Sequence, residues 1–204
     1  MGSDLSPELM EIGQSLAVAH GVDIEWREAD AEALPFAYAE FDTVISCLGV
    51  MFAPRHQRSA DELLRVCRQG GTVGLLSWTP EGFIGQLFKT LKPYAPPPPP
   101  GAQPPPLWGD EEHVRELLGD RVTDFVARRQ ILTSEYFDRP ADFREYFKTN
   151  CGPVMAVYRS IADDPDRVAE LDRELDSLVE RFDRGSETTV LDWECLVVTA
   201  RKRS

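Results

Sequence analysis

One apolar segment constrains the fold of this chain more than any other. The residues from Phe41 to Leu48 are almost continuously apolar, with Val44 and Ile45 at the centre of the run. Such a run is typical of a strand that is buried on both faces of a parallel sheet. Because parallel strands are joined by long crossover connections, we expect helices on both sides of this segment.

The segments around this strand have the expected helical and strand periodicities. Ser6 and Pro7 predict a helix start, and His20-Gly21 predicts its end; Leu5, Leu9, Ile12 and Leu16 recur between them at helical spacing. Apolar and polar residues then alternate over 22–27, which predicts a half-buried strand. Pro54 opens a helix that Gly70-Gly71 closes, and Thr72 to Ser77 predicts a second buried strand. The alternation predicts a parallel α/β sheet with right-handed crossovers.

The second half of the chain changes character. After a helix around 84–91, prolines 96–100 and 104–106 predict a stiff polyproline II surface loop. An SH3-type ligand is the alternative, although few basic residues flank the prolines. The pattern then predicts a short helix from Asp110 to Gly119, strands at 122–137 and 188–200, and three helices between those strands at 140–149, 154–161 and 165–182. We expect the two strands to form an antiparallel pair with a helical lobe inserted between them.

Composition excludes several classes of partner. The net charge is −13, from 22 basic and 35 acidic residues, which disfavours binding to nucleic acid and to anionic membranes. The four cysteines have no zinc-site spacing, so we expect no metal and four buried free thiols. No signal peptide or membrane span is evident, and we expect a cytoplasmic protein. Generic catalytic motifs and a histidine-centred triad are also missing.

Several weak motifs occur in a recognisable order. They are Asp4, Asp30-Ala31-Glu32, Leu34-Pro35-Phe36, the strand beginning Phe41-Asp42-Thr43, and Leu64-Arg65-Val66-Cys67-Arg68-Gln69-Gly70-Gly71. Together they resemble the class I S-adenosylmethionine-dependent methyltransferases, above all the small-molecule branch called type 11. Gln69 stands where that family usually has proline. The resemblance implies a Rossmann-like α/β core over 1–137 with a proline-rich loop at 95–106, a helical substrate lobe over 138–185, and a final strand over 186–204 that returns to the sheet.

The resemblance also implies a cofactor site for S-adenosylmethionine. Asp4, with Leu5 beside it, matches the acid that binds the ribose hydroxyls, and Asp30 and Ala31 match the positions that bind adenine. Ser46 and Cys47 fall at the strand end where the methionine part and the substrate meet. The alternatives are a helix-start Asp at 4, a turn Asp at 30, and packing roles at 46 and 47.

Residues for the methyl acceptor are less defined. His56, Trp78 and Tyr146 could face a small-molecule substrate, although core or surface roles are the alternative for each. We assign no catalytic residue. None is required, because the sulfonium of the cofactor is an activated methyl donor and the protein mainly has to align the acceptor.

The sequence departs from the family pattern at its start. The glycine-rich cofactor loop, the first strand and most of the second strand have no counterpart, so the resemblance implies an incomplete Rossmann-like sheet. Three explanations are open: a start site assigned too late, a truncated remnant, or a sheet completed by a homodimer or a partner chain. We therefore expect a small-molecule methyltransferase in which these 204 residues bind the cofactor weakly or not at all. The alternative is a non-catalytic relative that acts as an interaction or dimerisation module.

Overall fold

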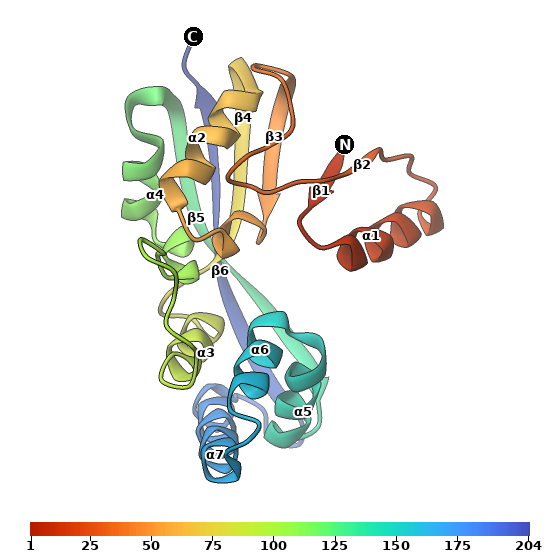
Figure 1. Cartoon of the computed structure of the whole chain (residues 1–204), viewed down its shortest axis with the longest axis vertical. Coiled ribbons are helices and arrows are strands. Elements are labelled where there is room, and N and C mark those ends of the chain that lie inside the picture. Colours follow the sequence, from red (N-terminus) through yellow and green to blue (C-terminus); the bar gives the residue numbers. More distant parts are fainter.

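The computed structural model describes all 204 residues and shows an elongated α/β molecule (Figure 1). The strands are β1 (Gly2–Asp4), β2 (Trp26–Glu28), β3 (Phe41–Cys47), β4 (Cys67–Trp78), β5 (Val122–Phe137) and β6 (Thr189–Lys202). The helices are α1 (Pro7–Ala19), α2 (His56–Val66), α3 (Phe83–Leu91), α4 (Glu111–Leu118), α5 (Pro140–Asn150), α6 (Gly152–Ser160) and α7 (Pro165–Phe182). Short 3-10 turns lie at Val50–Phe52, Pro105–Gly109 and Gly119–Arg121.

The strands form two separate sheets. The larger has the order β3-β4-β6-β5, in which β3 and β4 are parallel while β6 runs antiparallel to both β4 and β5. The smaller is the parallel pair β1-β2, and α1 connects its two strands. One edge of β1 and one edge of β3 therefore have no strand partner.

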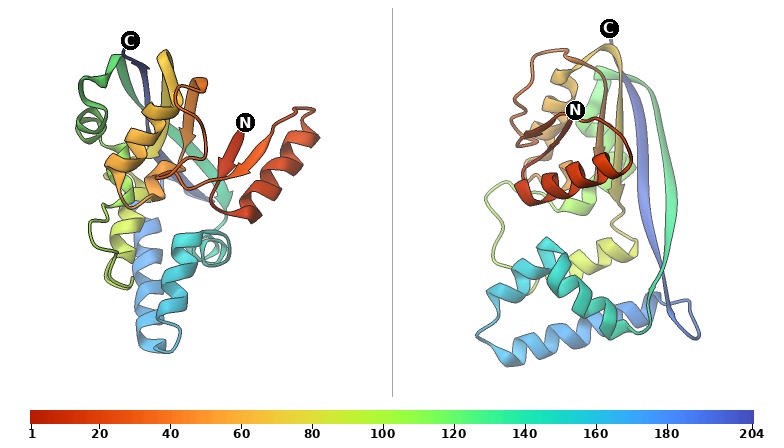
Figure 2. Two further views of the ribbon diagram at one scale, coloured as in Figure 1. Left: turned by 45° about the horizontal axis from the view of Figure 1, so that its top comes forward. Right: turned by 90° about the vertical axis from the view of Figure 1, so that its right-hand side faces the viewer.

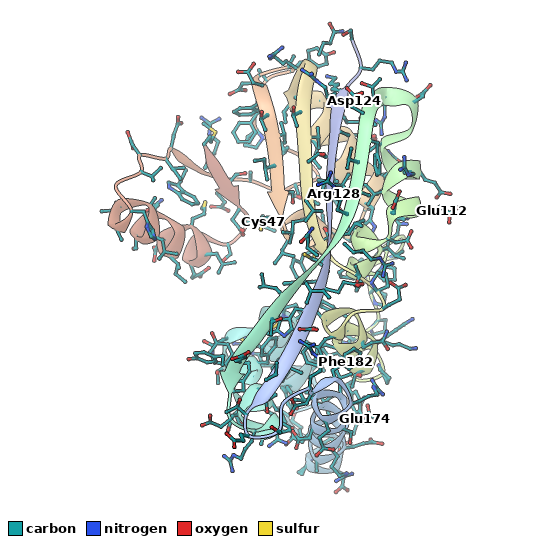
Figure 3. The ribbon with its side chains drawn as sticks, turned by 180° about the vertical axis from the view of Figure 1, so that it is seen from behind. Cys47, Glu112, Asp124, Arg128, Glu174 and Phe182 are labelled. Carbon is teal, nitrogen blue, oxygen red and sulfur yellow. The ribbon has the colours of Figure 1, made fainter.

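The upper hydrophobic core lies on one face of the larger sheet. Helices α2 and α4 and the Pro105–Gly109 turn cover this face, where Trp108, Met51 and Leu118 are almost wholly buried. Seen from the opposite side, no helix lies over the upper strands (Figure 3). Side chains on this side, such as Ile45 and Val126, are accordingly exposed.

A second core forms the lower part of the molecule. Helices α3, α5, α6 and α7 surround it, and the long strands β5 and β6 run from the upper core into it (Figure 2). Phe83, Phe143 and Leu171 have no exposed side-chain surface there. Helix α3 thus packs with the helical lobe, although it comes directly after the strand β4 in the chain.

Most of the predicted elements are confirmed. The helix predicted after Ser6 is α1, whose N-cap Ser6 accepts a hydrogen bond from the Leu9 N–H. Asp110 caps α4 in the same way through the His113 N–H. The strand predicted over 122–137 is β5, the three lobe helices are present, and β5 and β6 form the antiparallel pair.

Three details of the sequence-based prediction are wrong. The strand predicted over 22–27 is confined to Trp26–Glu28, because the three residues of β1 are its only partner. The run from 41 to 48 is a strand, but it lies at an edge and not within the sheet, so 73% of Ile45 is exposed. Gly70-Gly71 does not close a helix: α2 ends at Val66 and the glycines lie inside β4.

Candidate functional site

A cavity of about 720 Å³ lies between the N-terminal unit and the edge strand β3. We call it the interstrand cavity. Its walls come from β1, the start of α1, the turn after β2, strand β3 and the loop that leads to α2, and most of its lining is apolar. All six residues predicted for the cofactor line it: Asp4, Leu5, Asp30, Ala31, Ser46 and Cys47.

Asp4 ends β1 and is half-buried at the cavity wall. Its Oδ1 accepts a hydrogen bond from the Ser6 N–H at 2.9 Å, which orients the carboxylate at the beginning of α1. This local bond is a turn just before the N-cap Ser6, and it is consistent with the alternative of an Asp near a helix start. The second carboxylate oxygen has no hydrogen-bond partner in the chain and is available to a donor pair such as a ribose diol.

Asp30 begins the turn that follows β2. Its Oδ1 accepts from the Glu32 N–H at 2.8 Å, and its carbonyl oxygen accepts from the Ala33 N–H at 2.9 Å. These two bonds hold the carboxylate at the cavity wall with its Oδ2 unpaired. A fixed, exposed carboxylate of this kind can accept from an amino group of a ligand.

Ser46 and Cys47 form the carboxyl end of β3. Ser46 is buried, and its hydroxyl oxygen accepts from the Val50 N–H at 3.0 Å, so this side chain is engaged in holding the following loop. Cys47 is exposed, and Figure 3 shows it at the end of β3 that adjoins the N-terminal unit. The expectation of four buried thiols is therefore wrong at Cys47: the strand lies at a sheet edge and no neighbour covers the thiol. It is also wrong at Cys151, which is only half-buried, whereas Cys67 and Cys195 are buried and all four cysteines are free.

Sequence reasoning did not identify Glu32 and Arg55 as part of the site. The Glu32 side chain is only 3% exposed, and its carboxylate accepts from the Arg55 backbone N–H and the Arg55 Nε, each at 2.6 Å. This ion pair joins two walls of the interstrand cavity, the turn after β2 and the loop before α2. The order of motifs in the sequence includes Glu32, but nothing in that order indicates that the carboxylate is buried.

The three residues predicted for the substrate do not line the interstrand cavity. His56 is fully buried at the start of α2, where its Nδ1 lies 3.0 Å from Nε2 of His113 and its ring packs on Trp108. Trp78 packs edge-on against Trp193 and contacts both hydrophobic cores. Tyr146 lies on α5 with 44% of its surface exposed. The structure does not bring these three side chains together.

The buried histidine pair has perturbed protonation. Burial and, to a smaller extent, the neighbouring His113 lower the pKa of His56 to about 4, while the Glu32 carboxylate opposes the shift. Burial also lowers the pKa of His113, against the charges of Asp110 and Glu116. Both imidazoles are therefore neutral at pH 7, and they act as a polar contact between α2 and α4.

Two further properties of the chain concern ligands and membranes. No three His, Cys, Asp or Glu side chains come together in a way that could hold a metal ion. None of the helices combines the length and the apolar character needed to cross a bilayer.

Known protein families and solved structures show similarities to both the sequence and the fold of this chain. Residues 1–75 match the family model described as a methyltransferase domain. Over its full length the chain superimposes on the YcgJ protein from Bacillus subtilis with a TM-score of 0.60 at 16% identity, covering 82% of that chain. A SAM-dependent methyltransferase from Thermotoga maritima gives a TM-score of 0.52 at 15% identity, with 100% of this chain and 73% of the other covered. The fold is thus the α/β fold of class I methyltransferases.

Relatives found by sequence define the family more closely. The uncharacterized protein Rv1403c of Mycobacterium tuberculosis is 51% identical over 200 residues, which span 98% of this chain and 72% of the relative. The demethylmenaquinone methyltransferase of Thermus thermophilus is 32% identical over 91 residues, or 44% of this chain and 41% of that enzyme. The chain belongs to the same family as Rv1403c; its residues 1–75 match a methyltransferase-domain model, and its fold is similar to that of class I methyltransferases.

Proposed function

We propose that this protein transfers a methyl group from S-adenosylmethionine to a small molecule, with the interstrand cavity as the cofactor site. The observation that carries the proposal is that six residues chosen by motif alone line this one cavity, although they come from three separate segments of the chain. Similarity to an enzyme named for demethylmenaquinone supports a small-molecule acceptor. The net charge of −13 argues against a nucleic acid as the acceptor.

The residues present fit the adenosine part of the cofactor. Asp4 and Asp30 each keep one carboxylate oxygen free at the cavity wall, as binding of a ribose diol and an adenine amino group requires. When bound, the cofactor supplies a methyl group that is already activated by its sulfonium. The chain's own residues then orient the nucleoside and exclude water through the apolar walls of the cavity, and positioning of this kind can contribute about 7–11 kcal/mol to the reaction.

We further propose that the 204 residues bind the cofactor weakly. One wall of the interstrand cavity rests on β1, which has three residues and a single strand partner. The facing edge of β3 is also unpaired. The ligand therefore receives no backbone contacts from a strand between these two edges, and we expect a lower affinity as a result.

Calorimetric titration with S-adenosylhomocysteine tests this function. Binding with a Kd in the micromolar to low-millimolar range is the expected result. Asp30→Asn should weaken that binding about 10- to 100-fold, because a hydrogen bond to a charged acceptor contributes about 1.5–3 kcal/mol. Asp23→Asn is the matched control, since Asp23 is exposed and lies outside the cavity. The absence of heat at millimolar ligand would exclude cofactor binding by this chain.

A second candidate function, an interaction or dimerisation module, is favoured by one observation. The apolar face of α1 is uncovered: Leu9, Ile12 and Leu16 are each more than half exposed, and Ile45 on the β3 edge is exposed as well. Unpaired strand edges beside exposed apolar side chains are suited to pairing with another polypeptide, including a second copy of this chain. Sedimentation equilibrium would reveal a dimer as a concentration-dependent mass, and a strict monomer would count against self-association.

A further inference from the structure

Glu32 is the most buried carboxylate beside the predicted adenine position. Only 3% of its side chain is exposed, and such burial is costly unless the charge is paired and hydrogen-bonded. Arg55 provides that pairing through its backbone N–H, its Nε and its Nη2, the last at 2.5 Å from Glu32 Oε2. Because Arg55 is the N-cap residue of α2, the carboxylate also lies at the positive end of that helix.

The backbone of Glu32 is held as firmly as its side chain. Its carbonyl oxygen accepts from the Arg58 Nε at 2.9 Å, so a second residue of the α2 segment fastens the same turn. Its N–H donates to Asp30 Oδ1 at 2.8 Å. Glu32 thus connects the first turn of α2 to the Asp30 carboxylate, which faces the cavity.

We propose that Glu32 is a positioning residue for the ligand of the interstrand cavity. Its ion pair with Arg55 fixes the turn 30–33 against α2, and its N–H then sets the direction in which the Asp30 carboxylate points. This inference rests on the proposed function, because it assigns Asp30 to the adenine amino group. Its consequence is that Glu32 determines the selectivity for the base of the nucleoside, although its own carboxylate makes no contact with that base.

The test uses Glu32→Gln, which keeps the shape of the side chain and removes its charge. Glu28→Gln is the matched control, because Glu28 is exposed and lies outside the cavity. Each protein is titrated with S-adenosylhomocysteine and with S-inosylhomocysteine, in which a carbonyl replaces the adenine amino group. We expect the wild type and Glu28→Gln to prefer the adenosine ligand about tenfold, and Glu32→Gln to lose most of that preference. A residue with a purely structural role would weaken both ligands by the same factor, and an unchanged ratio would overturn the inference.

A second measurement does not depend on binding. Amide hydrogen exchange at position 32 should become at least about tenfold faster in Glu32→Gln, because the turn is no longer held, while exchange at Leu63 within α2 stays unchanged. If the wild type binds neither ligand, the proposed function fails for this chain, and exchange alone then decides whether Glu32 holds the turn. Unchanged exchange at position 32 would refute the positioning role in either case.

Discussion

Helices α1 and α7 have the same kind of sequence pattern and opposite surroundings. Leu9, Ile12 and Leu16 recur on one face of α1, and none of the residues of this helix is buried. Leu171, Leu175 and Leu178 recur in the same way on α7 and are at most 2% exposed. Apolar periodicity therefore predicts a helix and the face that needs cover, but it does not determine what provides the cover. Figure 1 shows the reason: α7 lies among the lobe helices, while α1 stands to one side of β3.

A pair of matched leucine substitutions gives the largest expected difference between these two regions. Leu171→Ala should lower the free energy of unfolding by about 2–5 kcal/mol, because it leaves a cavity in a fully buried cluster. Leu16→Ala should change it by about 0.5 kcal/mol or less, because 56% of Leu16 is already exposed. Urea unfolding measures both values. Equal losses would show that the face of α1 is covered in solution, as self-association would require.

The histidine pair at the upper core should give the next largest effect, a loss of folding stability at acid pH. His56 is neutral when folded, with a pKa of about 4, whereas an unfolded histidine titrates near 6.5. The unfolded state therefore takes up the proton first as the pH falls, and stability is lost between about pH 6.5 and 4. From pH 7 to pH 5 this loss should be about 2 kcal/mol.

Substitution identifies the group responsible for this acid sensitivity. In His56→Phe the difference in unfolding free energy between pH 7 and pH 5 should shrink by more than half, whatever the stability of the variant at pH 7. His20→Gln, at the exposed end of α1, is the control and should behave as the wild type. An undiminished pH dependence in His56→Phe would show that other groups cause it.

Ion pairs in the two regions should differ by a smaller amount in what they contribute to stability. Burial opposes ionisation of Asp172, but hydrogen bonds from Lys148 at 2.8 Å and from Tyr158 at 2.5 Å hold its pKa below the usual value. Asp172→Asn should therefore cost about 1–2 kcal/mol at pH 7. Glu25→Gln, which breaks an exposed pair with Arg27 in the N-terminal unit, should cost less than about 0.5 kcal/mol. Similar costs in urea unfolding would contradict the difference in burial between the two regions.

Thiol reactivity gives the smallest energetic effect and a direct test of the interstrand cavity. Cys47 is exposed, whereas burial raises the pKa of Cys67, Cys151 and Cys195. A colorimetric thiol reagent should therefore modify one cysteine per chain rapidly, and Cys47→Ser should abolish this fast phase with little change in stability. Saturating S-adenosylhomocysteine should slow the fast phase. If it does not, the ligand does not occupy the part of the cavity near Cys47.

The local structure of this protein follows largely from its sequence. Ser6 and Asp110 start α1 and α4 as predicted, β5 has its predicted bounds, and the three lobe helices follow their apolar spacing, because caps and periodicity depend on neighbours along the chain. The ordered motifs likewise selected six residues that share one cavity. What the sequence could not decide is how the elements cover one another. The exposure of Ile45, the burial of Glu32 and His56, and the separation of His56, Trp78 and Tyr146 all depend on contacts between distant segments. Burial is a property of the packed chain, and the apolar or charged character of a residue is only one of its causes.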